Sequence, residues 1–547
     1  MIARKSLARK SLISPFNGKL GPLLILPSLA LWASIAHAQA PPVTFLVNPA
    51  GGADIPGGNL NGEYSTLTFA LNFAQQTVAP TTGLVFRLSP GTYSESTNGE
   101  VFPINLRENS VVEGTSPTGV LFLNSSPPSL AVPTIQCDLS APQSYVELRN
   151  FSTTGVQTGI RVRGLGPSSE ATLERLTTEN SGGGGFAPTG IGSGIRTVAA
   201  GGILEVTVKA HTSRDLQIGL EVIANQGGFI SATIENSRYN PAPTAVNASS
   251  GTGILLDTTS TSSIALRSAN TSFFRKRDAI RTSINSPIPS ATIIDHCVIR
   301  SCGINAFGPM GALVLGGGIC EEANPSSFAI HNTAFFGNGA DLPDANMLFY
   351  DIENCIAQDA NVLAIATNSI TGDPMWVNAF ENDFHLLPGS PCLDAGTVPM
   401  TSLTSVDRDG DDRSASCAGL PDIGLDEQFD ADFYFPGGNL LTLGTNEEVR
   451  LIGPSNSLGF VLVDITPPSE FTGCSGLLLD PTAPITFLVA ALQMPAGVGG
   501  TATATTSIPI PNNPGLVGST FFTTTAYFEV TTLTVLNGNT VRGLYIQ

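Results

Sequence analysis

The stretch IENSRY, residues 234–239, decides the fold because versions of it recur along the chain. The other copies are LRNFS (148–152), SANTSF (268–273), IDHCVI (294–299), IHNTAF (330–335) and IENCIA (352–357). They share one polar position, which is occupied by Asn150, Asn236, Asn270, His296, Asn332 and Asn354. The next residue is small in five of the six copies, with Phe151 as the exception. From residue 234 onward the five copies follow one another at intervals of 22–36 residues. Short β segments that recur at such intervals predict a solenoid.

Pairs of a small and an aliphatic residue punctuate the same region. They are Gly159-Ile160, Gly194-Ile195, Gly219-Leu220, Gly253-Ile254 and Ala279-Ile280. Their uneven spacing favours a β-helix, because one corner loop of a rung can lengthen without disturbing the stack; GGGGFAPTG (182–190) is interpreted as such a loop. Stacked rungs pair their backbones along the axis and leave unpaired edges only at the ends. The recurrent Asn is expected at a corner, where it would satisfy backbone groups and form a side-chain ladder.

The region before the repeats combines a helix with short strands. Leu67, Ala70, Leu71 and Ala74 have helical spacing within residues 64–77, and residues 84–95 predict a strand, a Pro-Gly turn and another strand. Together with VNPAGGAD and GEVFPINL, this order over residues 43–120 resembles the DUF1565 opening of right-handed parallel β-helix proteins. The resemblance implies that the helix caps the coil and that the PGTY strand forms its first rung.

The chain is predicted to be all-β and to have four parts. Residues 1–40 have a basic start, an apolar core and small-residue cleavage sites, as a signal peptide does. Residues 41–380 are expected to form the capped parallel β-helix, residues 381–430 a sealing segment, and residues 431–547 a small β-sandwich. The sealing segment contains FHLLPGSPCLDAGT (384–397), DRDGDDR (407–413) and PDIGLDE (421–427). These motifs resemble a choice-of-anchor module, which follows the β-helix in exported bacterial proteins.

Charge excludes some kinds of partner. Residues 1–40 hold five of the 25 basic residues and none of the 44 acidic ones, so the remaining chain has 20 against 44, a formal net charge of −24. This balance argues against nucleic acids and anionic membranes as partners, and against an anionic polysaccharide unless a local basic patch exists. No run after residue 40 has the length and apolarity of a membrane-spanning helix, so we expect a secreted, extracellular or cell-surface protein.

One rung contains candidate catalytic residues. IIDHC (293–297) resembles the WIDH stretch of pectate lyases, in which an acidic group helps to bind calcium beside the substrate, although Ile293 replaces the Trp. A lyase needs such a cation and a base that removes a proton, so the weak candidates are Asp295, Arg275, Lys276 and Arg281. Against this, His296 and the next residue fit the repeat, which favours an ordinary rung. The paired-carboxylate motifs of polygalacturonases are absent from the sequence.

Two further sites are predicted in the sealing segment. DRDGDD offers four oxygen ligands suited to calcium, Asp407, Asp409, Asp411 and Asp412, without the pattern of an EF-hand. The alternative is a hydrogen-bonded turn fixed by Asp407 and Arg413, and we favour the turn. Of the eight Cys, Cys392 and Cys417 lie in one compact segment and are the first choice for a disulfide.

Three functions remain open from the sequence. The leading hypothesis is a non-catalytic exported protein whose long face binds polysaccharide or cell-envelope components. The second is a calcium-assisted polysaccharide lyase or a related carbohydrate-active enzyme. The third is a structural envelope component without a discrete ligand.

Overall fold

The structure is a computed structural model, and Pro42–Gln547 form one compact unit in it. It describes residues 41–125, 132–155, 158–179, 192–214, 216, 218–240, 251–302, 319–322, 327–342, 350–379, 383–387, 389–397, 407–408, 413, 420–427, 432–435, 440–464, 487–496, 501–516, 519–529, 534–537 and 542–546. The predicted signal peptide and the predicted loop 182–190 lie outside these ranges. No helix in the described part of the chain is long and apolar enough to cross a membrane.

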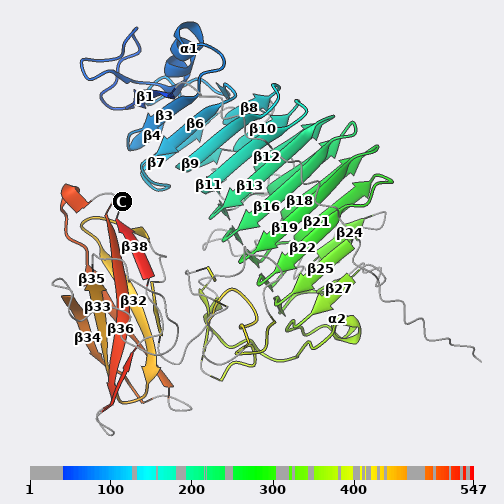
Figure 1. Cartoon of the computed structure of the whole chain (residues 1–547), viewed down its shortest axis with the longest axis vertical. Helices are drawn as coiled ribbons and strands as arrows, with labels where there is room; N and C mark the ends of the chain where they lie inside the picture. Colours follow the sequence, from blue (N-terminus) through cyan, green and yellow to red (C-terminus); the bar gives the residue numbers. More distant parts are fainter. Residues whose placement is uncertain are drawn as a thin grey trace, which may run out of the picture. The chain divides into compact units, whose positions relative to one another are not determined.

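A right-handed parallel β-helix forms most of the chain, as predicted (Figure 1). Each full rung has a longer strand and a short strand in one sheet, which we call sheet A, and a third strand in a second sheet, sheet B. The longer strands are β1 (Val43–Val47), β3 (Leu84–Leu88), β6 (Ser110–Gly114), β13 (Ile203–Lys209), β16 (Phe229–Glu235), β19 (Ser263–Ala269), β22 (Ala291–Asp295), β25 (Ser327–His331) and β27 (Tyr350–Glu353). The short ones are β4 (Gly91–Tyr93), β7 (Val120–Asn124), β14 (Thr212–Arg214), β17 (Arg238–Asn240), β20 (Ser272–Phe274), β23 (Val298–Arg300) and β26 (Ala334–Phe336); β9 (Ser144–Gly155) and β11 (Ser169–Glu179) span both positions.

In sheet B, each of the small–aliphatic pairs lies at the start of one of the middle strands. It contains β5 (Ile104–Leu106), β8 (Ile135–Leu139), β10 (Ile160–Gly164), β12 (Ser193–Ala200), β15 (Ile218–Asn225), β18 (Thr252–Thr259), β21 (Asp278–Asn285) and β24 (Ile319–Glu322). The aliphatic members of the five pairs are hydrogen-bonded neighbours, in the order Ile160, Ile195, Leu220, Ile254 and Ile280. The pairs therefore predict the register of this sheet as well as its existence.

The recurrent polar residue lies at the corner between the longer and the short strand of sheet A. All six copies of it have positive φ, between 48° and 59°. Arg175 and Ala210 occupy the same corner in two further rungs, with φ of 50° and 51°. The repeat pattern in the sequence did not include these two rungs, because neither residue resembles Asn. Asn tolerates this left-handed conformation better than most residues other than Gly, so the column records a backbone requirement.

The expected continuous Asn side-chain ladder is not formed, and at two rungs the small residue after the corner residue makes the contact between rungs. Ser237 Oγ accepts a hydrogen bond from the backbone N–H of His211, 3.2 Å away in the preceding rung. Thr333 Oγ1 accepts one from the N–H of Cys297 at 3.4 Å. By contrast, Oδ1 of Asn236 is buried without a hydrogen-bond partner among the described residues. Side chains of both kinds join rungs, since Asn150 Oδ1 accepts a hydrogen bond from Arg175 Nε of the next rung at 2.7 Å.

Stacked aromatic rings fill the coil interior and explain the glycines that start sheet B strands. Tyr239 and Phe273 stack with their ring centroids 5.3 Å apart and their planes 9° from parallel. A Cβ added at Gly219 would lie 2.3 Å from Cδ1 of Tyr239, and one added at Gly253 would lie 2.6 Å from Cδ1 of Phe273. A side chain at either position would therefore force apart the packed interior.

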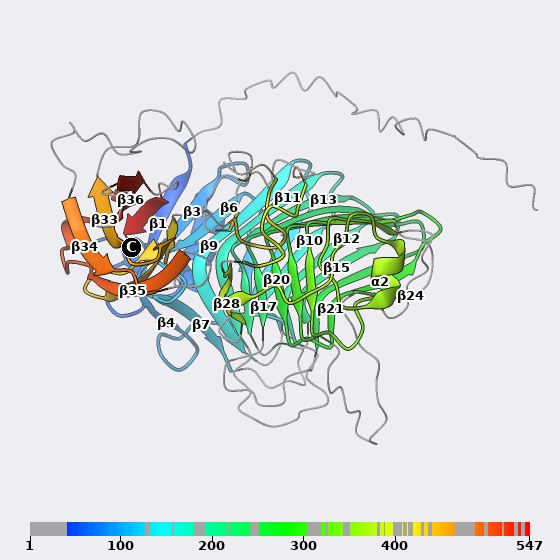
Figure 2. The ribbon, with the colours of Figure 1, turned by 90° about the horizontal axis from the view of Figure 1, so that it is seen from below.

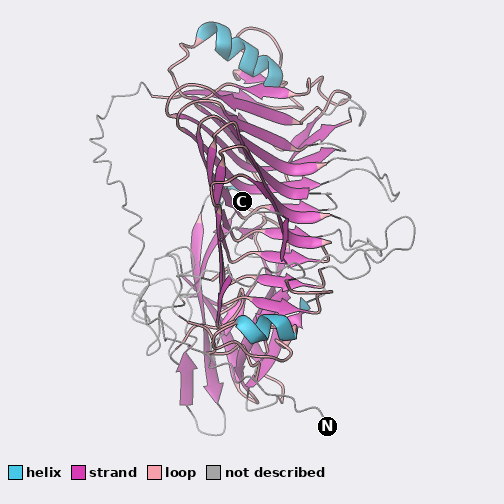
Figure 3. Ribbon diagram, turned by 90° about the vertical axis from the view of Figure 1, so that its right-hand side faces the viewer, coloured by secondary structure: helices cyan, strands magenta, loops and turns pink. Residues whose placement is uncertain are grey.

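Both ends of the coil carry a helix (Figure 3). The first, α1 (Leu67–Thr77), buries Leu67, Ala70, Leu71 and Ala74, as predicted, and follows β2 (Glu63–Tyr64). The buried carboxylate of Glu100 accepts hydrogen bonds from the N–H groups of Leu67 and Thr68, both at 2.8 Å, where a helix has unpaired donors. The second helix, α2 (Ala360–Ile365), adds Val362 to the same hydrophobic core.

Sheet A carries an alternating ladder of charges on its outer side. The paired positions of six successive longer strands are Arg87, Glu113, Arg149, Glu174, Lys209 and Glu235. Lys209 Nζ lies 3.2 Å from Glu235 Oε2, and Arg149 Nε lies 3.6 Å from Glu174 Oε2. Opposite charges on directly paired residues favour the register, whereas like charges oppose it. The alternation ends at Ala269, the next residue in the column.

Beyond the coil the chain forms two antiparallel structures. A hairpin of β28 (Trp376–Asn378) and β29 (Asp383–Leu386) begins the predicted sealing segment. The C-terminal part is a β-sandwich, as predicted, with its own hydrophobic core. Its first sheet contains β30 (Asp432–Tyr434), β32 (Asn446–Pro454) and β35 (Thr501–Pro509); its second contains β31 (Leu440–Leu441), β33 (Leu458–Asp464), β34 (Phe487–Gln493), β36 (Thr520–Glu529), β37 (Thr534–Asn537) and β38 (Arg542–Ile546). The four domain boundaries stay predictions.

Candidate functional site

The acidic candidate Asp295 ends β22 and lies against the corner of the coil. Its side chain is 1% exposed, and that of His296, at the corner itself with φ of 49°, is fully buried. His296 Nδ1 lies 2.9 Å from Asp295 Oδ1, and Nδ2 of Asn332 donates a hydrogen bond to the same oxygen at 3.0 Å. Burial, and then the charge of Arg413, lowers the pKa of His296 to about 4, so its ring is neutral at pH 7.

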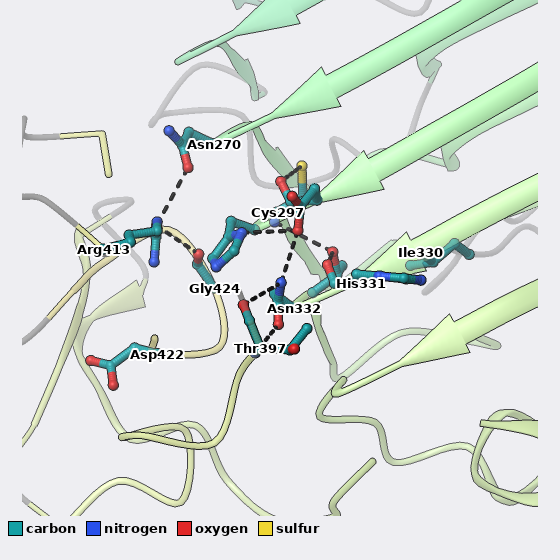
Figure 4. A network of polar contacts seen from close by, with 12 residues as sticks. Asn270, Cys297, Ile330, His331, Asn332, Thr397, Arg413, Asp422 and Gly424 are labelled. Carbon is teal, nitrogen blue, oxygen red and sulfur yellow. Dashed lines mark hydrogen bonds and ion pairs between the residues drawn. The ribbon is translucent and has the colours of Figure 1, made fainter. Parts of the chain in front are cut away.

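The sealing segment covers this corner (Figure 4). Asn332 Oδ1 accepts the N–H of Thr397 at 2.7 Å, and the main-chain oxygen of Asn332 accepts the N–H of Gly424 at 2.9 Å. Arg413 Nη2 donates to Asn270 Oδ1 at 3.4 Å and to the Gly424 oxygen at 3.1 Å. These contacts make the corner an attachment point for the segment, which we call the corner clamp: Asn270, Asp295, His296, Asn332, Thr397, Arg413 and Gly424. A polymer on the surface would not reach Asp295 here.

The three basic candidates lie in different surroundings from Asp295. The Arg275 guanidinium lies over the ring of Phe274, 4.9 Å from its centroid. Lys276 is 1% exposed, and its Nζ donates to the main-chain oxygen of Leu216 at 3.3 Å. Arg281 projects from β21 of sheet B, with Nη1 3.5 Å from an oxygen of Asp278. The structure therefore does not bring the four candidates together on one accessible face.

The acidic motif of the sealing segment is described only in part. Asp407 Oδ2 accepts the N–H of Glu427 at 3.0 Å, and Arg413 is buried with its Nη1 3.5 Å from Glu427 Oε2, so Asp407 and Arg413 both contact Glu427; the predicted turn between them stays a prediction. Burial, and the nearby Asp422, raise the pKa of Glu427. Asp409, Asp411 and Asp412 lie outside the described residues, and within those that are described no group of His, Cys, Asp or Glu is arranged to hold a metal ion. The calcium site stays a prediction.

The predicted disulfide also stays a prediction. Cys392 is buried with a free thiol, and Cys417 lies outside the part of the chain that the structure describes. Burial raises the pKa of the Cys392 thiol to about 12, so the thiol is protonated at neutral pH.

The outer side of sheet B presents two columns of mostly polar side chains that run along the stack, interrupted by the aliphatic Val198, Ile223 and Leu255; on β15, Glu221 and Ile223 are each 8% exposed. The first column contains Asn105, Gln136, Arg161, Arg196, Glu221, Leu255 and Arg281, and the second contains Asp138, Arg163, Val198, Ile223, Asp257 and Ser283. We call these two columns the sheet B face. Figure 2 shows β10, β12, β15 and β21, which carry much of this face, side by side. The two columns contain no aromatic residue, so hydrogen bonds and charge dominate their chemistry.

Three arginines of the sheet B face lie close together on β10 and β12. Arg163 makes a two-pronged ion pair with Asp138, in which Nε donates to Oδ1 at 2.6 Å. Arg196 Nε lies 3.2 Å from Glu221 Oε2. Arg161 donates to the neutral side-chain oxygen of Gln136. The side chains of Arg163 and Arg196 are 36% and 37% exposed, so they are held in place and still open to solvent.

Burial and neighbouring charges shift the pKa values of Arg161 and Arg163 in opposite directions. Burial lowers the pKa of Arg161, and the charges of Arg163 and Arg196 lower it further. The hydrogen bonds that Arg163 donates to Asp138 raise the pKa of Arg163. All three guanidinium groups remain charged at neutral pH, since an arginine keeps its proton in proteins. The sheet B face therefore contains a local basic patch in a chain of acidic composition.

Sequence analysis did not identify this patch, although a signal for it was present. In the pairs that start the strands of sheet B, the small and aliphatic residues are followed by the outward residue of the first column. That residue is Arg in GIR (159–161) and again in GIR (194–196). Aligning the pairs and then reading the third residue of each would have revealed three arginines in one column, of which Arg161 and Arg196 lie on neighbouring strands.

Comparison with known proteins adds little to this picture. A solved structure of a pectate lyase, Pel9A, aligns with 72% of this chain and 98% of its own length, with 14% sequence identity and a TM-score of 0.40. No residue role is carried over at this level of likeness. No protein-family model matches the sequence, and no curated protein matches it either. The resemblances of residues 43–120 and 384–427 therefore stay predictions.

Proposed function

We propose that the chain is an exported, extracellular or cell-surface protein that binds polysaccharide or related envelope components without cleaving them. The binding surface in this proposal is the sheet B face. Solenoids present extended surfaces of this kind, on which successive rungs offer equivalent positions to a polymer. Planar polar side chains such as those of Arg161, Gln136 and Asn105 suit sugar hydroxyls, because each can donate or accept two hydrogen bonds.

The single observation that carries the proposal is the register of the sheet B face. Its polar side chains repeat along the axis at the spacing of parallel strands, about 4.8 Å, and several are fixed by ion pairs and hydrogen bonds. Side chains that are already ordered lose less conformational entropy when a ligand binds. A polymer lying along the stack would therefore meet a prearranged row of donors and acceptors.

A polysaccharide lyase is the second candidate, and little supports it in the geometry. Proton abstraction from a sugar requires the base to reach the substrate, within hydrogen-bond distance or through one water. Asp295 is 1% exposed beneath the corner clamp, and Lys276 is also 1% exposed. Arg281 on the sheet B face is the one basic candidate placed near the proposed binding surface.

The test is binding of the purified chain to a polysaccharide array, with release of unsaturated uronate measured by absorbance in the presence of calcium. We expect binding to at least one polymer and no product. Gln136→Ala combined with Arg281→Ala should weaken that binding, whereas Arg267→Ala, an exposed arginine of sheet A, serves as the matched control. Binding that all three substitutions leave unchanged would refute the location, and product formation would favour the lyase.

A further inference from the structure

Both sheets of the coil contain directly paired charges of opposite sign, and each also contains a like-charged pair, Glu170 with Glu205 in sheet A and Arg161 with Arg196 in sheet B. In sheet A, each residue of the alternating ladder has a neighbour of opposite sign in the next strand, from Arg87 through to Glu235. In sheet B, Arg161 is paired directly with Arg196 in the neighbouring strand. Like charges on directly paired residues destabilise a sheet, so the second arrangement is opposed by the same physics that favours the first.

A third arginine adds to the concentration of positive charge. Arg163 lies two residues from Arg161 on β10, and its side chain therefore projects from the same side of the sheet. Two of the three arginines have a carboxylate of their own, Asp138 for Arg163 and Glu221 for Arg196. The positive charge that remains uncompensated is centred on Arg161.

Arg161 has unused hydrogen-bonding capacity. Its contact with Gln136 involves Nη2 and a neutral acceptor, and its Nε is buried without a hydrogen-bond partner among the residues that the structure describes. A guanidinium offers five donors in a planar fork that matches the oxygens of a carboxylate or sulfate. An anion placed between Arg161 and Arg196 would supply acceptors and relieve the repulsion between the two charges.

The carboxylates further along the sheet B face limit what kind of anion carrier fits. Glu221 follows Arg196 in the first column, is 8% exposed and is paired with Arg196, and Asp257 lies in the second column on the strand after Glu221. A polymer with an acidic group on every sugar, lying along the stack, would bring a later acidic group against the Asp257 carboxylate. A polymer in which neutral sugars separate the acidic ones avoids that repulsion.

We propose that Arg161 and Arg196, with Gln136 and Arg163 beside them, form a subsite for the acidic group of a polysaccharide whose acidic sugars are separated by neutral ones. This rests on the proposed function, because it assumes that a polymer binds along the sheet B face. The acidic group is a carboxylate or a sulfate ester, which share the oxygen geometry that two guanidinium groups recognise. The subsite selects the ligand, while the rest of the face supplies contacts to neutral sugars.

The experiment compares four probes by isothermal titration: hyaluronan, in which carboxylated and neutral sugars alternate; κ-carrageenan, in which sulfated and neutral sugars alternate; polygalacturonate, with a carboxylate on every sugar; and neutral dextran. We expect hyaluronan or κ-carrageenan to bind more tightly than the other two, and the stronger of them identifies the group. Arg161→Gln should weaken that binding by about tenfold or more, as the loss of a charge-assisted contact predicts. The matched control Arg267→Gln should leave it unchanged.

Two outcomes separate the failure of this inference from the failure of the proposed function. If no polymer binds the unmodified chain, the proposed function fails; if polymers bind but neutral and acidic ones bind equally, or polygalacturonate binds best, only the subsite is wrong. The melting temperature without ligand gives a second readout. Arg161→Gln removes a repelling charge and should not lower it. A clear decrease would mean that Arg161 is structural, which would overturn the assignment.

Discussion

Replacement of Asn332 by Ala should loosen the sealing segment from the coil. Asn332 is fully buried at the corner, and its side chain makes three hydrogen bonds: Oδ1 accepts the N–H of Thr397 at 2.7 Å, and Nδ2 donates to the Thr397 oxygen at 3.3 Å and to Asp295 Oδ1 at 3.0 Å. Alanine can make none of them. The carboxylate of Asp295 would lose a donor in a site that water does not reach.

The size of the effect follows from these contacts. Three hydrogen bonds at about 1 kcal/mol each, with a further penalty where a buried partner stays unsatisfied, give about 3–5 kcal/mol of lost stability. Alanine at φ of 50° adds about 1 kcal/mol, because Asn tolerates the left-handed region better. Asn236→Ala is the matched control: it has the same corner conformation, and its Oδ1 has no hydrogen-bond partner in the described structure, so only the backbone penalty is expected.

Urea unfolding followed by fluorescence measures the difference. Trp376 is the one Trp outside residues 1–40, and it packs beside Phe336 and Phe384 in the small core under the sealing segment. The midpoint of the unfolding transition reported by Trp376 fluorescence should therefore move to a lower urea concentration in Asn332→Ala and change little in Asn236→Ala. Equal losses in the two variants would show that the corner clamp contributes no stability, and the reasoning would be refuted.

Three further predictions concern the coil. Glu100→Gln should cost about 1–3 kcal/mol in urea unfolding, since an amide replaces the carboxylate that accepts two N–H groups of α1 at 2.8 Å. Gly253→Ala should lower the unfolding free energy by about 1–3 kcal/mol, because its Cβ would lie 2.6 Å from Phe273. Burial lowers the pKa of His211 to about 3 and that of His296 to about 4, from about 6.5 in an unfolded chain. As the pH falls from about 6.5 to 4, the unfolded chain binds protons that the folded one excludes, so the unfolding free energy should fall, and His211→Asn should flatten this dependence.

The fold could be predicted from the sequence because each rung imposes the same backbone conformation at the same corner. The left-handed turn selects Asn or a similar residue, and the small residue after it ties neighbouring rungs together, so both leave a readable column. Where the turn is made by Arg175 or Ala210, no such preference is visible and the rung was missed. The α1 helix was predicted residue by residue, because its buried positions follow the helical period.

The sheet B face was missed because its residues have no common type. Outward positions of a rung face solvent and vary freely, so nothing in their composition marks them. Their meaning depends on which residue lies next to which, and Arg161 stands out only when it is paired with Arg196. The candidate Asp295 shows the converse: it was noticed for its resemblance to a catalytic stretch, yet it lies in the corner clamp, because Thr397, Arg413 and Gly424 contact the coil at this corner.

The outward residues of the two sheets therefore differ in whether they help to set the register of the strands. In sheet A, alternating charges stabilise the register of the rungs up to Glu235; from Ala269 onward the column passes to Asp295 and into the corner clamp. Sheet B needs no such ladder, since the glycines and aliphatic residues that start its strands already set its register from the inside. Its outer residues are consequently released from that task. The repulsive pair of Arg161 and Arg196 persists there, as the pair of Glu170 and Glu205 does in sheet A, and an anionic group bound at Arg161 would relieve the repulsion between the two arginines.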